Sequence, residues 1–339
     1  MQAIYEVAVS TPRMVYRLAD QTIVVEARDT YAARIIERLF AGWYLTPVTV
    51  TEDAAVAPAI VIASGVKPPE IPRAWPQFEI AGGGVCYTDG KSSFIEVENS
   101  IVAIDHPRQA VEVWINGMVD LQSTSLTRVV TYALAAALRR RGLFELHSGA
   151  AIDPLSGQGL LIIGPSGSGK STLTVQLATA GWSFLTDDVL VLSSDRAGVR
   201  AWPLRRCFAI TAETFAASDF LRARASIDYT QAQPENKKQF APHHIFNSEF
   251  KEQCVPKHLF FSQLSGGERS RVVRLSSPEV MTRLIRMNPW SGYDRWTAPK
   301  HLAVLSALVT QCAGYSLLAG RDLLDPKTAV ELIADYTRD

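Results

Sequence analysis

Nine consecutive residues have the types and spacing of a phosphate-binding loop. They read GPSGSGKST and comprise Gly164, Pro165, Ser166, Gly167, Ser168, Gly169, Lys170, Ser171 and Thr172. The apolar stretch LLII precedes them and the helical pattern STLTVQLATAG follows, which is the context that the motif GxxxxGK[ST] requires. The glycines allow backbone N–H groups to converge on phosphate oxygens, and the helix would add the positive end of its dipole. The sequence therefore predicts a site for the phosphates of a nucleotide.

Two side chains at the end of this motif have predicted roles of their own. Lys170 would reach the β- and γ-phosphates, and the hydroxyl of Ser171 would bind Mg²⁺. ATP and Mg²⁺ are therefore the expected cofactors. A Gly/Ser turn that binds nothing is the alternative interpretation of these residues.

Two adjacent carboxylates interrupt an apolar run shortly after the loop. The run FLTDDVLVL, residues 184–192, reads as a buried strand containing Asp187 and Asp188. An unpaired buried charge is costly, so a chemical role would explain the pair. A strand returning from the helix would bring its end beside the phosphates, where phosphoryl transfer needs a carboxylate for the metal or the nucleophile. A solvent-exposed turn is the alternative.

A second glycine motif, LSGGERSRV at residues 264–272, is similar to the signature of the ATPase domains of ABC transporters. In those proteins the signature opens a helix, and a strand ending in Asp-Glu follows. Here the strand-like stretches KHLFFSQ and RVVRLSS flank the motif. We therefore predict a hairpin turn at residues 265–268 and do not expect an ABC ATPase.

Composition excludes several other classes of protein. The 34 Lys and Arg balance 34 Asp and Glu, so no net charge favours nucleic acid or anionic lipid. The four cysteines form no CxxC pair, and the six histidines have no metal-binding spacing. The N-terminal residues lack the basic start and apolar core of a signal peptide, and VVTYALAAAL is too short to span a bilayer. We expect a soluble cytoplasmic protein that binds neither nucleic acid nor membrane.

The order of elements predicts an α/β chain with two domains. Residues 1–124 combine short strand patterns with one amphipathic helix, TYAARIIERLFAGW, and predict an α+β domain. The helix SLTRVVTYALAAALRRR opens the second domain, residues 125–339. There, the strands FELHSGAAI and LLIIG are joined by a short glycine turn, so we expect them to pair antiparallel. The sheet should therefore be mixed, unlike that of a plain doubly wound fold.

Residues 145–195 resemble the catalytic half of the HPr kinase/phosphorylase family. His147 in ELHSGAAI, the phosphate loop, its helix and the strand into Asp187 and Asp188 occur in that family in the same order. More closely, the chain is similar to HPr-kinase-related proteins of biosynthetic gene clusters, some of which phosphorylate a peptide precursor. The resemblance implies a P-loop kinase domain of the HPr-kinase/PEP-carboxykinase-like type. Since HPr kinases are hexamers, it also allows a homo-oligomer.

The resemblance implies roles for individual residues. Asp187 would be the base that accepts the proton of an incoming hydroxyl, with Asp188 as its partner, and His147 would lie near the transferred phosphate. A core histidine bonded to the backbone is the alternative for His147. Glu213 is the nearest candidate for a further metal-binding acid, beside Ser171 and Asp187.

The chain also departs from the family pattern. The glycine-rich, asparagine-containing loop that engages the protein substrate is not recognisable, which argues against HPr as the acceptor and against the reverse phosphorylase reaction. NPWSGYDRW, residues 288–296, occupies a comparable place, and Arg295 there is a candidate for assisting the phosphates. The polar loop 234–242 offers Lys237 and Lys238, although a solvated loop is the simpler interpretation.

The predicted function is ATP-dependent transfer of the γ-phosphate to a Ser or Thr hydroxyl of a peptide or small protein. The N-terminal domain would recognise that substrate. A small-molecule hydroxyl kinase and a non-catalytic ATP-binding regulator are the alternatives.

Overall fold

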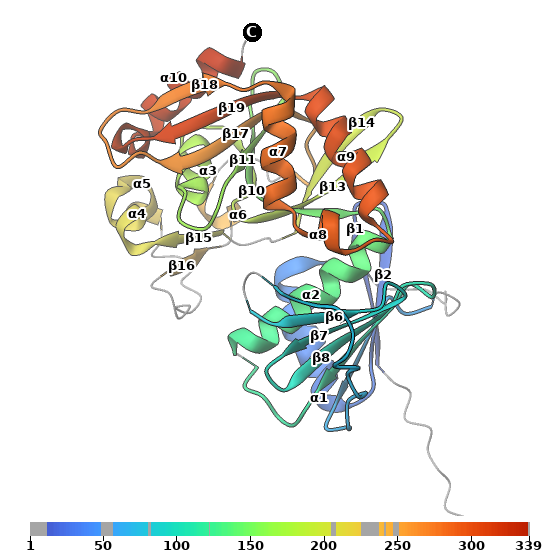
Figure 1. Cartoon of the computed structure of the whole chain (residues 1–339). Helices are drawn as coiled ribbons and strands as arrows, with labels where there is room; N and C mark the ends of the chain where they lie inside the picture. Colours follow the sequence, from blue (N-terminus) through green and yellow to red (C-terminus); the bar gives the residue numbers. More distant parts are fainter. Residues whose placement is uncertain are drawn as a thin grey trace, which may run out of the picture. The chain divides into compact units, whose positions relative to one another are not determined.

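A computed structural model describes residues 12–48, 57–80, 83–121, 123–204, 208–224, 237–240, 242–246 and 251–337. The chain divides into two compact units, Met1–Arg141 and Gly142–Asp339, each built on a large mixed sheet (Figure 1). The fold is thus mixed α/β, as predicted. The boundary follows α2 (Thr124–Arg140) instead of preceding it, so the predicted boundary at 124/125 is misplaced. The physical reason is that α2 packs on strands of the first sheet.

The first unit is a nine-stranded sheet in the order β3-β1-β2-β4-β9-β8-β7-β6-β5. β5 to β9 form an antiparallel meander, whereas β4 is parallel to both β2 and β9. Its strands are β1 (Arg13–Leu18), β2 (Gln21–Ala27), β3 (Thr46–Pro47), β4 (Ile60–Ser64), β5 (Gln77–Glu79), β6 (Val85–Thr88), β7 (Ser92–Val97), β8 (Ser100–Asp105) and β9 (Ala110–Ile115). Its helices are α1 (Thr30–Ile36), the π-helical η1 (Glu37–Tyr44) and α2.

Helix α2 begins where the sequence predicts it and covers this sheet. The side chain of Ser123 caps it by accepting a hydrogen bond from the N–H of Leu126. Buried residues such as Val130 and Leu134 line the face of α2 that packs on β8 and β9. Strands β7 and β9 alternate between buried and half-buried residues, the pattern of a sheet with one covered face.

The second unit is built on an eight-stranded sheet in the order β14-β13-β10-β11-β17-β19-β18, with β12 beside β10. A separate pair, β15 and β16, lies outside this sheet. The strands are β10 (Phe144–Ile152), β11 (Gly159–Ile163), β12 (Ser183–Thr186), β13 (Val189–Asp195), β14 (Gly198–Pro203), β15 (Phe208–Thr211), β16 (Lys237–Phe240), β17 (Pro256–Leu264), β18 (Arg271–Arg274) and β19 (Ala313–Ala319). The helices are α3 (Lys170–Thr179), α4 (Ala212–Ala217), α5 (Asp219–Arg224), α6 (Pro242–Ile245), α7 (Ser277–Met287), α8 (Trp290–Tyr293), α9 (Ala298–Gln311), the 3₁₀ turn η2 (Arg321–Leu324) and α10 (Pro326–Thr337).

Both faces of this sheet are covered, which explains why β11 is apolar throughout. Leu160 and Ile162 belong to a core shared with α3 and α10, whereas Leu161 and Ile163 face a core shared with α7 and α9. All five residues of β11 are buried. The predicted antiparallel pairing of β10 with β11 is confirmed, and so is the mixed sheet, since β11 and β17 are parallel.

The run FLTDDVLVL forms two strands, not the single strand that we predicted. β12 and β13 pair with different parts of β10, and Asp187 and Asp188 form a bend between them. Within this bend, the carbonyl of Asp188 accepts a 2.9 Å hydrogen bond from the N–H of Ser148. The ladder on β10 also shifts register between Ala150 and Ala151. The chain therefore needs the two aspartates to step from one strand to the next.

Two further predictions of local structure are wrong. The LSGGERSRV segment is not a hairpin turn, because β19 lies between β17 and β18 and pairs with both. The segment instead crosses the end of β19. The stretch predicted as a solvated loop contains β16, which pairs with β15, while residues 234–236 and 241 lie outside the described ranges.

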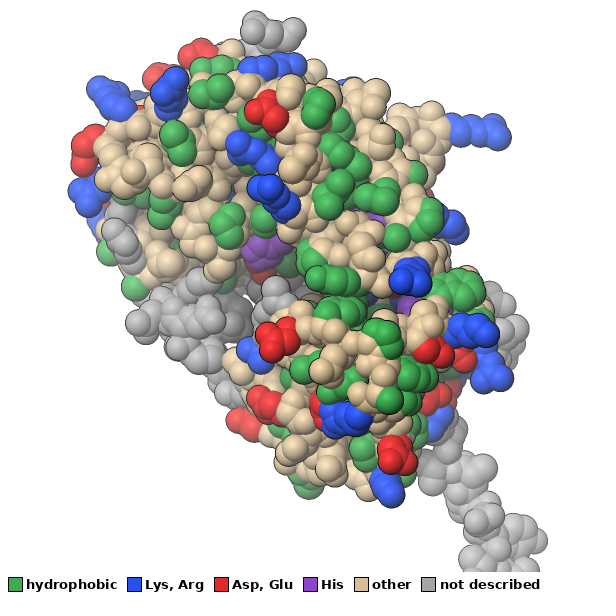
Figure 2. All heavy atoms as spheres, viewed as in Figure 1, with side chains coloured by type: hydrophobic (Ala, Val, Ile, Leu, Met, Phe, Trp, Pro, Cys, Tyr) green, Lys and Arg blue, Asp and Glu red, His purple; other side chains and the backbone are tan. Residues whose placement is uncertain are grey.

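The surface carries charges of both signs, in line with the balanced composition. On the face drawn in Figure 2, Lys and Arg side chains alternate with Asp and Glu among hydrophobic and polar ones. Within the described ranges, no helix combines the length and apolarity needed to cross a bilayer.

Candidate functional site

The glycine motif forms a tight loop between β11 and α3. Gly167 and Gly169 have φ angles of 80° and 90°, in the left-handed region that favours glycine. A Cβ on Gly164 would lie 2.5 Å from Oγ of Ser168 and 2.6 Å from the carbonyl oxygen of Ser262. The loop is therefore closed on itself so tightly that its first position cannot carry a side chain.

Lys170 is the first residue of α3, and its side chain folds back over this loop. The Nζ atom donates hydrogen bonds of 2.9 Å to the carbonyl oxygens of Gly164 and Pro165. The side chain is 5% exposed, yet Lys170 lines the pocket described below. A positive charge is thus held at the N-terminal end of a helix, where the helix dipole also favours an anion.

Two of the predicted site residues, His147 and Asp188, meet beside this loop. Nδ1 of His147 lies 3.2 Å from Oδ1 of Asp188, with the side chains 38% and 28% exposed. Asp187 is different: it is 2% exposed, and its Oδ2 accepts a 3.1 Å hydrogen bond from the N–H of Ala209. The hydroxyl of Ser171 donates a 3.4 Å bond to the backbone carbonyl of Asp187. Of the two carboxylates, the one of Asp188 lines the pocket.

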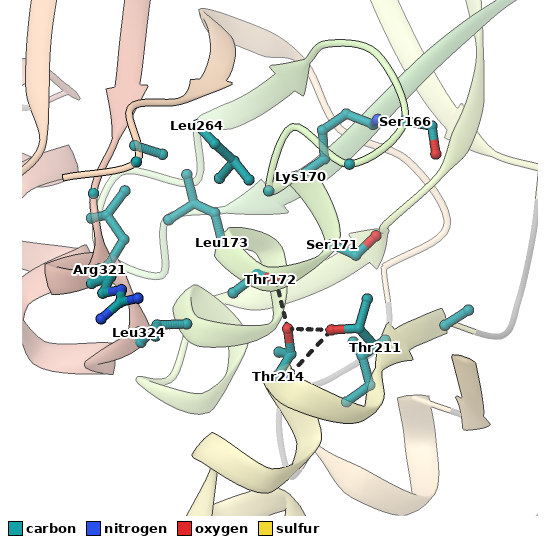
Figure 3. Close-up of a pocket in the computed structure, with 18 of the residues that line it drawn as sticks. Ser166, Lys170, Ser171, Thr172, Leu173, Thr211, Thr214, Leu264, Arg321 and Leu324 are labelled. Atoms are coloured by element: carbon teal, nitrogen blue, oxygen red, sulfur yellow. Dashed lines mark hydrogen bonds between the residues drawn. The ribbon is translucent and has the colours of Figure 1, made fainter. Parts of the chain in front are cut away.

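A pocket of about 400 Å³ brings these groups together. In Figure 3, Lys170, Ser166 and Ser171 lie on one side of it, and Leu264, Leu324 and Arg321 lie on the other. Its volume is typical of a site for a small ligand. The lining residues are His147, Ser166, Gly167, Gly169, Lys170, Ser171, Thr172, Leu173, Asp188, Ala209, Ile210, Thr211, Thr214, Leu264, Gly266, Gly267, Ala319, Gly320, Arg321, Leu323 and Leu324.

Three threonines connect the start of α3 to α4 across the floor of this pocket. The hydroxyls of Thr172 and Thr214 lie 3.0 Å apart, and those of Thr214 and Thr211 lie 3.1 Å apart (Figure 3). The Thr211 hydroxyl also accepts a hydrogen bond from the N–H of Thr214 and so caps α4. The network fixes the wall formed by β15 and α4 relative to the last residue of the glycine motif.

The oxygen donors that line the pocket suit Mg²⁺ better than a metal that requires three or more protein ligands. Among the described residues, no group of three or more His, Cys, Asp or Glu is arranged to hold a metal. Mg²⁺ commonly binds one or two protein oxygens and completes its shell with water and phosphate. The Ser171 hydroxyl and the Asp188 carboxylate are oxygen donors of this kind. Glu213 lies on α4, but its side chain is outside the described part of the chain.

The other residues that the sequence suggested for phosphate binding are not among the described residues that line the pocket. Arg295 is exposed between α8 and α9 and is absent from the described lining. The side chains of Lys237 and Lys238 are outside the described part, although their backbone forms part of β16. Sequence reasoning also missed Arg321, which follows β19. Its position after a strand could have indicated it, because ligands in open α/β sheets bind beyond the carboxyl ends of parallel strands.

Comparisons with known proteins include a distant structural similarity. No protein-family model matches the chain, and no curated protein matches it. A solved structure of the Hpr(Ser) kinase/phosphatase from Coxiella burnetii is similar at 16% sequence identity, with a TM-score of 0.25. The match covers 34% of this chain and 58% of that protein's length. The candidate site is therefore assigned from its own geometry.

Proposed function

We propose that the second unit is an ATP-dependent kinase that transfers the γ-phosphate to a hydroxyl group. One observation carries this proposal: a single pocket is lined both by the glycine loop with Lys170 and by the His147–Asp188 pair. Phosphoryl transfer requires the first set to position and neutralise the phosphates and the second to orient the incoming oxygen. The resemblance of residues 145–195 to HPr kinases supports the same reading.

The glycine loop, Lys170 and the start of α3 would bind the phosphates. Loop N–H groups and the helix N-terminus provide donors, and the Lys170 ammonium can leave the two loop carbonyls to reach a phosphate oxygen. The Ser171 hydroxyl would help to hold Mg²⁺, which, when bound, would offset negative charge on the transferred phosphate. The loop holds its own backbone in place, so the rearrangement needed on binding is that of the Lys170 side chain.

We assign the proton-accepting role to Asp188, whereas the resemblance to HPr kinases implies Asp187. A general base must contact the hydroxyl that it deprotonates. Asp188 is 28% exposed at the pocket, and His147 lies against one of its oxygens. Asp187 is 2% exposed and bonds to the N–H of Ala209, so its role would be to position β15. His147 would fix the orientation of the Asp188 carboxylate.

A Ser or Thr hydroxyl of a peptide or small protein is the proposed acceptor. The 38% exposed His147 and the 28% exposed Asp188 leave the reacting end of the pocket accessible to a side chain presented from outside. This accessibility, together with the resemblance to peptide-phosphorylating relatives, supports a polypeptide over a buried metabolite.

Intact-mass spectrometry tests this function. A size-fractionated extract of the source cell would be incubated with MgATP and either the wild-type protein, Asp188→Asn or Asp187→Asn. We expect a polypeptide to gain one phosphate with the wild type, and Asp188→Asn to lose that transfer while retaining ATP binding. ATP consumption with only the small-molecule fraction would indicate a metabolite kinase. Binding of ATP without transfer to any fraction would contradict a kinase and favour a regulator.

A further inference from the structure

The wall of the pocket opposite Ser166 and Ser171 is built from two segments that the proposed chemistry does not use. They are residues 264–268, which follow β17 and contain the LSGGE motif, and residues 319–324, which follow β19. We call them together the leucine–glycine wall. In Figure 3, the labelled residues of this wall are Leu264, Leu324 and Arg321.

Hydrogen bonds fasten the two segments of this wall to each other. The carbonyl of Ala319 accepts from the N–H of Ser265, and the carbonyl of Gly267 accepts from the N–H of Arg321. Ser270 adds two links, since its hydroxyl donates to Asp322 and accepts from the N–H of Gly320. These hydrogen bonds join the two segments into one continuous surface.

Glycines and leucines form most of the surface that this wall presents to the pocket. Gly266, Gly267 and Gly320 line the pocket without side chains, and a Cβ on Gly320 would collide with the backbone of Arg269. Leucine side chains surround these glycines; they are Leu173, Leu264, Leu323 and Leu324. Leu264 is 57% exposed although it lies beside the glycine loop, so its side chain is available to contact a ligand bound there.

We propose that the leucine–glycine wall is the subsite for the base of a nucleoside triphosphate. This inference rests on the proposed function and deepens it. The glycine loop would hold the phosphates, and the acceptor would approach at His147 and Asp188. The leucine–glycine wall then remains for a planar apolar group attached to the phosphates. The base of a nucleotide is such a group.

The same wall would recognise the base by shape and not by hydrogen bonds. Five of its backbone donors are already used internally; they are the N–H groups of Ser265, Gly267, Gly320, Arg321 and Asp322. Of the described wall residues that line the pocket, Arg321 alone is charged, and its guanidinium lies 3.6 Å from the carboxylate of Glu268. Apolar contacts discriminate weakly, whereas hydrogen-bonded sites reject a wrong partner by about 10⁴-fold. ATP and GTP should therefore bind with affinities within about tenfold of each other.

Calorimetric titration of the full chain with MgATP, MgGTP and magnesium tripolyphosphate tests the subsite. Leu264→Ser should weaken MgATP binding about tenfold and leave tripolyphosphate binding unchanged, since only the nucleotide carries a base. Gly267→Leu, whose Cβ has no neighbour closer than 3.6 Å, should block the nucleotides in the same selective way. Leu155→Ser is the matched control, because Leu155 is 79% exposed in the turn between β10 and β11, away from this pocket.

The outcomes separate the two proposals. If wild-type protein binds neither MgATP nor tripolyphosphate, the proposed function fails and the base subsite fails with it. If Leu264→Ser and Gly267→Leu leave MgATP affinity unchanged, or weaken tripolyphosphate equally, the base subsite is overturned while the kinase proposal stands. GTP affinity more than about 100-fold below that of ATP would overturn recognition by shape alone.

Discussion

The hydroxyl of Ser262, in β17, donates a 2.7 Å hydrogen bond to the carbonyl oxygen of Ser168 in the glycine loop. The two residues are 94 positions apart in the sequence, and Ser262 is 4% exposed. The strand beside β11 therefore helps to set the conformation of the loop before any ligand binds. Such preorganisation lowers the cost of binding phosphate.

Ser262→Ala should consequently weaken binding of MgATP by about three- to tenfold, the effect of one lost hydrogen bond. The loop would lose its anchor, and the Ser168 carbonyl would be left without this donor. Calorimetric titration gives the affinity, and thermal unfolding shows whether the fold is intact. Ser306→Ala, on the exposed face of α9, is the control. Equal affinities for Ser262→Ala and wild type would show that the loop needs no such anchor.

The contact between His147 and Asp188 predicts that the two side chains act as a unit. Asp188→Asn should lower the rate of phosphate transfer at saturating ATP by about 10²- to 10⁴-fold, as for loss of a general base. His147→Gln should have a smaller effect, because it removes only the group that orients the carboxylate. The double variant should be no slower than Asp188→Asn, since groups that act together give non-additive losses. Additive losses in single-turnover measurements would contradict a shared role.

Gly149 in β10 separates the sheet from the first turn of α3. A Cβ there would lie 2.3 Å from Oγ1 of Thr174, which itself bonds to the carbonyl of Lys170. Gly149→Ala should therefore lower the free energy of unfolding by about 1–3 kcal/mol through overpacking. Chemical denaturation measures this change.

A second substitution identifies the clash as the cause. Adding Thr174→Ala to Gly149→Ala removes the colliding oxygen, so part of the lost stability should return. Adding Thr174→Ser keeps that oxygen and should restore nothing. Equal recovery in both double variants would show that the Thr174 hydroxyl is not the obstacle.

In the first unit, Asp29 joins α1 to β4 and makes stability depend on pH. Its carboxylate accepts hydrogen bonds from the N–H of Ala32 and from both the N–H and the hydroxyl of Ser64. Burial raises the pKa of Asp29, but these hydrogen bonds outweigh burial, so that the pKa lies below its usual value of 3.8. A carboxyl with a lowered pKa stabilises the fold above its unfolded pKa, and this stabilisation is lost as pH falls through the folded pKa.

Asp29→Asn should therefore cost about 1 kcal/mol of unfolding free energy at pH 7, because hydrogen bonds to a charged acceptor are stronger than those to a neutral one. The difference between variant and wild type should shrink below about pH 4, as the wild-type carboxyl is protonated. Urea denaturation at pH 7, 5 and 3.5 measures it. A difference that stays constant over this range would show that the charge of Asp29 contributes nothing.

Local patterns predicted the elements around the glycine loop because those elements depend on neighbouring residues. The β10–β11 pair is joined by a short turn, and α3 follows its motif directly, so periodicity and turn chemistry suffice. The break at Asp187 was missed because it depends on how β12 and β13 pair with β10. The domain boundary was misplaced for a similar reason, since the partner of α2 is a sheet formed much earlier in the chain.

The far side of the pocket could not be predicted because it depends on strand order. Leu264 and Arg321 line the pocket only because β17 and β19 follow β11 as parallel neighbours. The same holds for Thr211 and Thr214, whose position depends on β15 lying near the start of α3. The roles of Glu213, of the first unit as a substrate-recognition domain, and of a homo-oligomer stay predictions.

The parallel pairing of β11 with β17 also has a consequence for how the protein is made. During synthesis, β10 and β11 leave the ribosome long before residues 256–264, and the residues after β19 come later still. Contacts between distant segments form slowly, because a long stretch of chain must first be closed into a loop. We expect the nascent chain to acquire affinity for nucleotide only when the segment around Arg321 has emerged, so that a partly made protein consumes no ATP.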